Sequence, residues 1–172
     1  LAAGNRVMIK LPEETPKSNA VIKTLITEIF HSDEVAVFGE ELTNPAEFTA
    51  LEFDHIIFTG SARVGRLVME AAAKNLVPVT LELGGKSPAI VAEDYSTSDA
   101  ALRIVHGKAA MSGQICVSPD YALVQTDRIP EFVLAAQSAF SRLFPDGAEG
   151  RPEYCSIVND RQVSRIKGLL DD

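Results

Sequence analysis

The stretch Thr80-Leu81-Glu82-Leu83-Gly84-Gly85-Lys86-Ser87-Pro88 decides how this chain is organised. An apolar run, Val79 to Leu83, predicts a buried strand, so Glu82 within it must be paired, protonated or exposed at the strand end. The two glycines that follow end the strand, because without a Cβ they allow a sharp turn or the close approach of a ligand. We therefore expect one α/β unit over residues 1–83 and a second over residues 84–172.

Composition limits the classes of function. The chain has 172 residues, 46% of them hydrophobic, which suffices for one ordinary domain or two small pieces. A net charge of −8 without a basic cluster argues against nucleic-acid binding. No apolar run is long enough to span a membrane, and no signal peptide is evident. Two cysteines, Cys116 and Cys155, give neither a disulfide framework nor a metal-ligand spacing, which favours a reducing cytosol.

The first half of the chain alternates strand and helix signals. Strands are predicted at 6–10, 35–38 and 55–59, and helices at 16–30 and from Asn44-Pro45 toward Leu51. The first helix begins with Thr15 and Pro16 and carries an apolar face that includes Val21, Leu25 and Ile29. This order favours a parallel sheet with helices on its faces.

A glycine-containing turn, Gly60-Ser61-Ala62-Arg63-Val64-Gly65, leads from the third strand into another helix. Such a turn presents free backbone N–H groups and the positive end of the helix dipole, which suit a phosphate. The turn matches neither the spaced-glycine dinucleotide fingerprint nor a phosphate loop. A plain helix start is therefore the alternative to a phosphate site.

After Pro88 we predict strands at 89–91 and 121–125, and helices at 100–110, at 130–144 and after Asn159. Cys116 lies between them, 34 positions after Glu82, in a loop with Gly113 and Asp120 on either side. A lone cysteine is often a small buried hydrophobe. A loop, however, can leave the thiol accessible, and its backbone N–H groups can favour the thiolate.

Glu82 also allows two interpretations. It is either a carboxylate at an exposed strand end or in a salt bridge, or a general base set in an apolar strand. The three histidines have no evident partner in the sequence, and we expect core or surface roles for His31, His55 and His106.

Three segments together resemble the NAD(P)-dependent aldehyde dehydrogenase superfamily: Phe58-Thr59-Gly60-Ser61, the run from Val79 to Pro88, and Gly113-Gln114-Ile115-Cys116. In that family the glutamate motif, the cysteine motif and their 34-residue separation occur together, and the resemblance covers essentially the whole chain. Residues 70–76 and 116–121 are most similar to the class 3 branch, which includes fatty, aromatic and coniferyl aldehyde dehydrogenases.

The resemblance implies an α/β fold: part of a parallel-sheet, Rossmann-type NAD(P)-binding domain over 1–83, then part of an α/β catalytic domain over 84–172. Cys116 would be the nucleophile that attacks the aldehyde, and Glu82 the base that activates water to hydrolyse the thioester. The resemblance also implies the residues that bind the cofactor. Lys10 and Glu13 would hold the adenosine ribose, Ser61 would contact the pyrophosphate, and Gly60 and Gly65 would let the helix and its turn come close to the cofactor. Leu83 and Gly84 would follow, with Gly84 on the nicotinamide side. The family usually has lysine-proline-serine-glutamate, whereas Lys10-Leu11-Pro12-Glu13 moves the proline by one position.

The implied reaction is oxidation of an aldehyde, coniferyl or another aromatic or medium- to long-chain one, to its acid with NAD, and with NADP as a further cofactor. We expect a cytoplasmic homodimer with no metal, nucleic-acid or membrane partner. The chain begins at Leu1 in what resembles a helix end, so we also expect a segment of a longer protein that is inactive alone. The alternatives are a relative that passes the acyl group to coenzyme A, against which Glu82 argues, and a catalytically silent nucleotide-binding chain.

Overall fold

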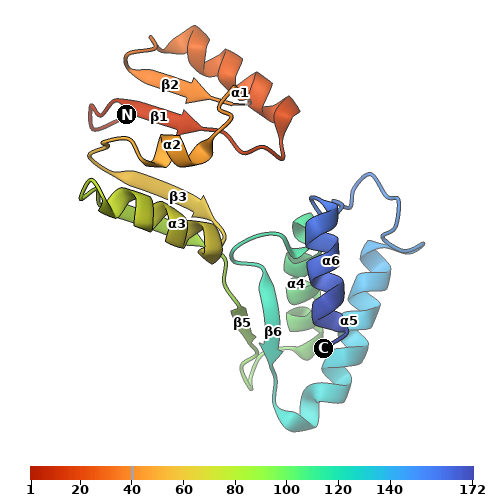
Figure 1. Cartoon of the computed structure of the whole chain (residues 1–172). Helices are drawn as coiled ribbons and strands as arrows, with labels where there is room; N and C mark the ends of the chain where they lie inside the picture. Colours follow the sequence, from red (N-terminus) through yellow and green to blue (C-terminus); the bar gives the residue numbers. More distant parts are fainter. Residues whose placement is uncertain (40) are drawn as a thin grey trace. The chain divides into compact units, whose positions relative to one another are not determined.

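The computed structural model describes residues 1–39 and 41–172 of the chain (Figure 1). These residues form two compact units, Leu1–Glu82 and Leu83–Asp172. Both units combine helices with short strands, which confirms the predicted α/β class.

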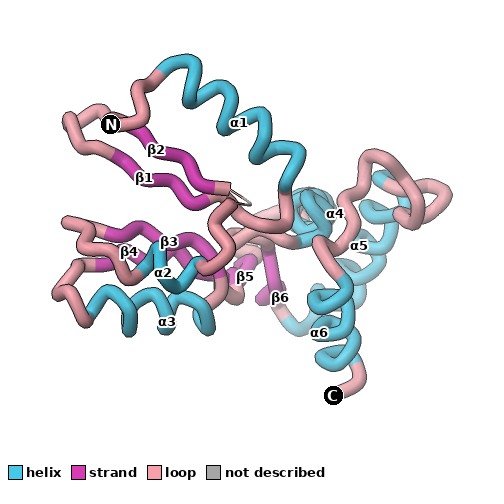
Figure 2. Tube along the Cα trace, turned by 45° about the horizontal axis from the view of Figure 1, so that its top comes forward, coloured by secondary structure: helices cyan, strands magenta, loops and turns pink. Residues whose placement is uncertain are grey.

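The first unit alternates strands and helices, as the sequence predicts. Its elements are β1 (Val7–Lys10), α1 (Pro16–Ile29), β2 (Val35–Phe38), α2 (Pro45–Thr49), β3 (Ile56–Gly60), α3 (Ala62–Ala73) and β4 (Val79–Leu83). Strands β1 and β2 are parallel, with Val7 opposite Val35, and β3 is the neighbour of β4 (Figure 2). The described strands thus form separate pairs where the sequence favoured a single sheet.

Side chains at the helix starts explain where the helices begin. Asn44 and Ser61 accept backbone N–H groups of α2 and α3 as N-caps. Thr15, the expected cap of α1, instead donates to Asn19 Oδ1 at 3.0 Å. The side chain of Asn19 is buried and donates to the carbonyl of Pro12, so its amide links α1 to the loop that precedes the helix.

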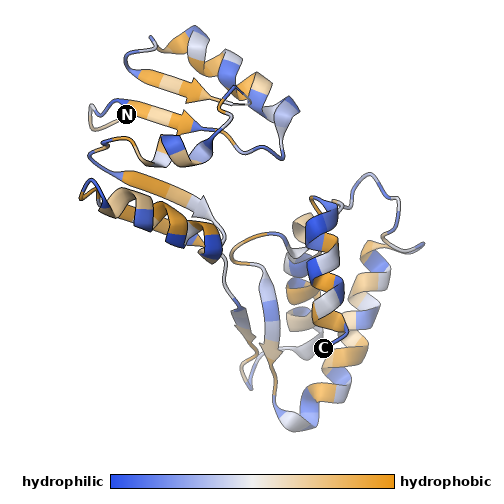
Figure 3. Ribbon diagram, in the orientation of Figure 1, coloured by the Kyte–Doolittle hydropathy of each residue, from blue (hydrophilic) through white to orange (hydrophobic). Residues whose placement is uncertain are grey.

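The apolar face predicted for α1 is present, but much of it is exposed. Figure 3 shows hydrophobic residues along the strands and on part of this helix. Val21 is 60% exposed and Ile29 is 70% exposed, whereas Ile26 and Phe30 are half-buried. A two-stranded sheet is too narrow to cover the full width of an amphipathic helix. The buried apolar residues of this unit are Leu11, Val35, Val68, Ala72 and Val77.

The second unit packs helices beside a two-stranded parallel sheet. Its elements are β5 (Ser87–Ile90), α4 (Thr97–Ala109), the 3₁₀ turn η1 (Ala110–Gly113), β6 (Pro119–Leu123), the 3₁₀ turn η2 (Thr126–Arg128), α5 (Ile129–Leu143) and α6 (Asp160–Leu170). Helices α4 and α5 lie side by side (Figure 1). Ala101 and Ala139 are fully buried on these helices, and their small side chains allow close contact.

The predicted bounds of α4 and of both strands in this unit are wrong, and β5 covers Ser87–Ile90 rather than 89–91. Helix α4 begins at Thr97 rather than residue 100, because Ser96 caps it by accepting the N–H of Asp99 at 3.3 Å. Strand β6 covers Pro119–Leu123 rather than 121–125, because its pairing with β5 begins at Pro119 and ends at Leu123.

The guanidinium of Arg128 fixes the loop between β5 and α4. It donates to the backbone carbonyls of Ala92, Glu93 and Tyr95 and to Thr97 Oγ1. A planar group with five donors suits such a curved set of carbonyls. Arg128, which immediately precedes α5, therefore holds the loop that leads from β5 to α4.

Candidate active site

Glu82 lies on β4, and its side chain is exposed. Burial along Val79–Leu83 alternates between half-buried and exposed, so the predicted buried strand is wrong. The alternation arises because successive strand side chains point to opposite faces and only one face of β4 is covered. An exposed carboxylate is accessible to water and to reacting groups.

Cys116 lies in the loop between η1 and β6, and its thiol is free and exposed. The loop begins with three consecutive residues of positive φ: Met111 at 48°, Ser112 at 55° and Gly113 at 73°. Glycine adopts this conformation freely, whereas an ordinary L-residue costs about 1–2 kcal/mol there. Further along, the N–H of Ser118 donates to the carbonyl of Ile115 at 3.0 Å, which forms a turn around Cys116.

The segment that follows Glu82 contacts the Cys116 loop within the second unit. Ser87 Oγ donates to the carbonyl oxygen of Cys116 at 3.4 Å. A Cβ built on Gly85 would lie 3.8 Å from the same oxygen. Residues 85–87 and the Cys116 loop, which are distant in sequence, are thus brought together within the second unit.

An ion pair makes a second link between these segments. Lys86 Nζ lies 2.8 Å from Asp120 Oδ1. The strand register skips Asp120, because Ser87 is opposite Pro119 and Pro88 is opposite Tyr121. A residue left out of the ladder in this way can direct its side chain elsewhere.

Sequence reasoning gave no role to Lys86, Ser87 or Asp120. The ion pair follows from the parallel pairing of β5 with β6, which no pattern in the sequence indicates.

Lys10 and Glu13, predicted at the cofactor ribose, form an ion pair at the end of β1. The hydrogen bond from Lys10 lowers the pKa of Glu13, as does a backbone hydrogen bond. Glu13 is therefore negatively charged at neutral pH, and its side chain is 65% exposed. Lys10 and Glu13 thus contact each other, and the Glu13 carboxylate remains accessible to solvent.

The turn from Gly60 to Gly65 is a capped helix start. Ser61 Oγ accepts the N–H of Val64 at 3.3 Å, and the Ser61 carbonyl accepts the N–H of Gly65 at 2.8 Å. A Cβ on Gly60 would lie 2.5 Å from the ring of Phe58, so a side chain there would displace that ring. The interaction of this turn with a phosphate stays a prediction.

The remaining predicted cofactor residues follow Glu82 directly. Leu83 is half-buried, and Gly84 is exposed with no atom within 4 Å of a built Cβ. The space beside the Gly84 backbone is therefore open.

The three histidines are exposed, and the rings of two of them contact another side chain. His31 Nδ1 lies 2.6 Å from Asp33, and His55 Nε2 lies 2.9 Å from Thr80 Oγ1. The imidazole of His31 lowers the pKa of Asp33. These contacts give His31 and His55 surface roles.

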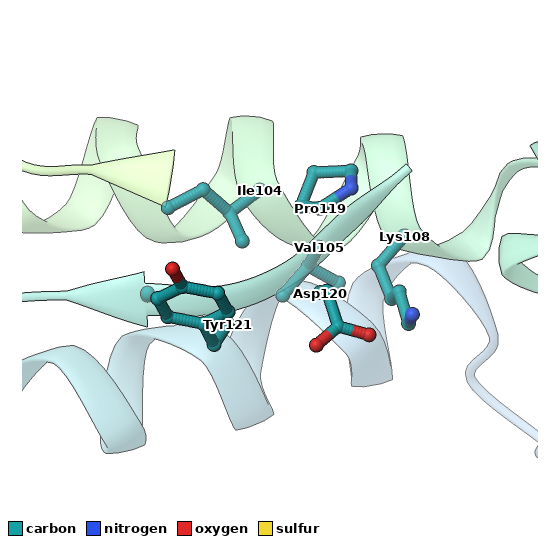
Figure 4. A pocket seen from close by; sticks show the side chains of 7 residues that line it. Ile104, Val105, Lys108, Pro119, Asp120 and Tyr121 are labelled. Atoms are coloured by element: carbon teal, nitrogen blue, oxygen red, sulfur yellow. The ribbon is translucent and has the colours of Figure 1, made fainter. Parts of the chain in front are cut away.

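A cavity of about 160 Å³ lies between α4 and β6 (Figure 4). Its walls are mainly apolar, with one acidic and one basic side chain at the edge, and Cys116 does not line it. The lining residues are Ile104, Val105, Lys108, Pro119, Asp120, Tyr121 and Ala122.

Residues 1–39 and 41–172 contain neither a metal-ligand cluster nor a membrane-spanning helix. No group of three His, Cys, Asp or Glu side chains could hold a metal ion there. Over the same residues, no helix has both the length and the apolar character that crossing a membrane requires.

Comparisons with known proteins agree on one family. The family described as the aldehyde dehydrogenase family matches residues 1–172. The chain is 50% identical over its whole length to a probable coniferyl aldehyde dehydrogenase of Pseudomonas aeruginosa, of which it covers 36%.

Two solved structures share the fold. A substrate-bound Staphylococcus aureus AldH is 39% identical with a TM-score of 0.88, over 99% of this chain and 37% of that one. A mutant of Pseudomonas syringae AldC, in complex with NAD⁺ and octanal, is 27% identical with a TM-score of 0.87, over 99% of this chain and 36% of that one. The chain thus spans little more than a third of these relatives.

Proposed function

The chain belongs to the aldehyde dehydrogenase family, and from this premise we propose that the protein that carries it oxidises an aldehyde to a carboxylic acid with NAD(P)⁺. The observation that carries the proposal is the contact of the Gly85–Ser87 segment with the backbone of Cys116, because it brings the glycine-containing part of the first motif to the thiol loop within the second unit. The likeness to a probable coniferyl aldehyde dehydrogenase supports an aromatic aldehyde as substrate.

Cys116 supplies the nucleophile in the proposed reaction. Its thiolate forms a bond to the aldehyde carbon and turns the carbonyl oxygen into an alkoxide, which the Cys116 backbone N–H can stabilise. As the alkoxide oxygen re-forms its double bond to carbon, a hydride leaves and a thioester remains on Cys116. NAD(P)⁺, when bound, supplies the acceptor for that hydride.

Glu82 acts in the second half of the reaction. Its carboxylate removes a proton from a water molecule, whose oxygen forms a bond to the thioester carbon. The carbon–sulfur bond then breaks, the acid leaves and the Cys116 thiolate is restored. The exposure of Glu82 supports this role, since water must reach the carboxylate.

The residues present fit a dinucleotide. The Lys10–Glu13 pair offers a donor and an acceptor for ribose hydroxyls, and α3 begins at Ser61 with its N-terminal N–H groups. Open space beside Gly84 leaves room for a planar ring. The charge on Glu13 opposes a 2′-phosphate, so NAD is the preferred cofactor and NADP the secondary one.

We assign residues 1–83 to the cofactor domain and residues 84–172 to the catalytic domain, and we propose a cytoplasmic homodimer for the full-length protein. Sedimentation of that protein at several concentrations tests the dimer. A monomer at all concentrations would refute it.

The experiment that tests the function supplies the purified full-length protein with NAD⁺ and either coniferyl aldehyde or octanal. We expect NADH and the free acid in equal amounts. Formation of the acyl-coenzyme A ester on addition of coenzyme A, with no free acid, would instead identify an acylating enzyme. Binding of NAD⁺ without product from any aldehyde would identify a silent nucleotide-binding protein.

A further inference from the structure

We propose that Gln114 is a positioning residue, which holds the Cys116 loop against residues 156–158 and thereby places the thiol for hydride transfer. The inference rests on the proposed function, because it concerns the same thiol. The hydrogen bonds of the Gln114 side chain all go to backbone atoms, so it acts on the thiol through the loop.

The side-chain amide of Gln114 uses both of its ends. Nε2 donates to the carbonyl of Met111 at 2.9 Å and to the carbonyl of Ser156 at 3.1 Å. Oε1 accepts the N–H of Val158 at 3.0 Å. One amide therefore joins the turn before Cys116 to a segment that lies 42 to 44 residues later in the chain.

A second contact ties the same two segments. Ser112 Oγ donates to the carbonyl of Cys155. Ser112 and Gln114 lie on the same side of Cys116 in sequence, so the segment that enters the thiol loop is held at two points. The segment after the thiol is held separately, through Asp120 and Lys86.

The conformation of the turn explains why such contacts are needed. Met111 and Ser112 adopt positive φ, which side-chain-bearing residues rarely do, and such conformations persist where surrounding contacts fix them. The Met111 carbonyl also accepts the backbone N–H of Gln114 at 3.0 Å. With the Gln114 amide removed, the turn loses its links to residues 156 and 158 and can relax, and the loop that carries Cys116 moves with it.

The effect on chemistry follows from the tolerance of a reacting pair. A misplacement of about 1 Å in a nucleophile can lower the rate by about 10²-fold. Gln114 therefore affects the rate of the chemical step at each active site, and a residue that only stabilised the fold would affect the number of intact sites.

The test uses three variants of the full-length protein. Gln114→Leu removes all three side-chain hydrogen bonds at similar size. Gln114→Glu keeps an acceptor for the Val158 N–H but loses the donors to Met111 and Ser156. Gln137→Leu, at an exposed glutamine on α5, is the matched control.

Hydrogen exchange of the Val158 amide tests the tether without any substrate. Gln114→Leu should speed this exchange by at least roughly fivefold, the scale of one lost hydrogen bond. Gln137→Leu should leave it close to the wild-type rate, and Gln114→Glu should speed it less than Gln114→Leu, because its carboxylate still accepts the Val158 N–H but faces the carbonyls of Met111 and Ser156. Unchanged exchange in Gln114→Leu would overturn the tether.

The pre-steady-state burst of NADH tests the consequence for catalysis. With saturating aldehyde and NAD⁺, Gln114→Leu should lower the burst rate constant by roughly 10–100-fold and keep the burst amplitude per folded protein. Gln114→Glu should lower the rate constant less, and Gln137→Leu should not change it. A reduced amplitude with an unchanged rate constant would show a merely structural role and overturn the proposal.

Comparison of the wild-type protein with the variants separates the positioning role of Gln114 from the proposed function. A wild-type protein that forms no NADH from any aldehyde, either in the first turnover or in the steady state, would overturn the function, and the positioning role with it. A normal wild-type burst with equal rate constants in all variants would overturn only the positioning role of Gln114.

Discussion

The two units hold their candidate residues in different ways. In the first, partners are close in sequence: Lys10 pairs with Glu13, and Ser61 caps the helix that it begins. In the second, the Cys116 loop is held by residues far away, at Ser87 on one side and at 155–158 on the other. Local contacts suit a surface that binds a ligand, whereas a reacting atom is fixed from several directions.

The backbone conformation at the candidate residues also differs between the two units. Helix α3 begins with an ordinary extended N-cap at Ser61, where φ is −79°. The turn before Cys116 runs through three positive φ values, two of them at residues with side chains. Leu76 in the first unit also has a positive φ, 56°, but there it is a single residue, whereas Met111 and Ser112 are consecutive and distant contacts stabilise them.

The largest expected effect tests whether the second unit carries the chemistry. Cys116→Ala in the full-length protein removes the covalent step and should abolish hydride transfer, even in a single turnover with saturating NAD⁺. Cys155→Ala, at the other exposed cysteine, should retain the wild-type burst. Rapid-quench detection of NADH measures both. Hydride transfer in Cys116→Ala would place the nucleophile elsewhere.

Glu82 lies at the end of the first unit, and its substitution tests whether that unit also contributes a reacting group. Glu82→Gln should keep the first burst of NADH and lower steady-state turnover by about 10²-fold, the scale of a lost general base. The acyl group should then accumulate on Cys116 and appear as an increase in protein mass. A slow burst without an acyl-enzyme would mean that Glu82 deprotonates the thiol instead.

A smaller effect is expected at the predicted ribose site. Glu13 is ionised at neutral pH, as a glutamate with an ordinary pKa also is, and its negative charge repels a 2′-phosphate. Glu13→Gln should raise the ratio of kcat/KM for NADP⁺ over that for NAD⁺ by roughly two- to fivefold, since exposed charges interact weakly. Glu14→Gln is the neighbouring control. An equal change in both variants would remove Glu13 from the ribose site.

The smallest effect compares a methionine in each unit. Met111→Asn should stabilise the protein by about 0.5 kcal/mol, because Asn tolerates positive φ better than Met. Met69→Asn on α3 should destabilise it by a similar amount, because Asn is a poorer helix former. The midpoints of urea unfolding report both values. Shifts of the same sign would mean that φ at Met111 contributes little.

Much of the fold could be predicted because its signals are local. Alternating strand and helix patterns gave the element order, and Asn44, Ser61 and Asn159 were correctly placed at helix starts. The start of α4 was missed although Ser96 and Asp99 have the spacing of a capping box, because the polar residues around them obscure the helical period. The burial of β4 and α1 was missed because burial depends on which neighbours cover each face.

The candidate site was predictable at the level of motifs. The residues Glu82 and Cys116 could be singled out from their surroundings, but not the bond from Ser87 to the Cys116 carbonyl. The tether from Gln114 to Val158 spans 44 residues and involves a backbone N–H, for which sequence carries no side-chain signal. Contacts between a side chain and a distant backbone group depend on where the folded chain places that group.

The tether at Gln114 also orders events during synthesis. Val158 is added to the growing chain 44 residues after Gln114. At roughly 5–20 residues per second, the ribosome needs about 2–9 s to make that stretch. For those seconds the turn before Cys116 lacks its distant partners. The thiol that carries the chemistry is therefore translated before the residues that fix its loop, and the nascent chain acquires its reactive geometry only after residue 158 has been added.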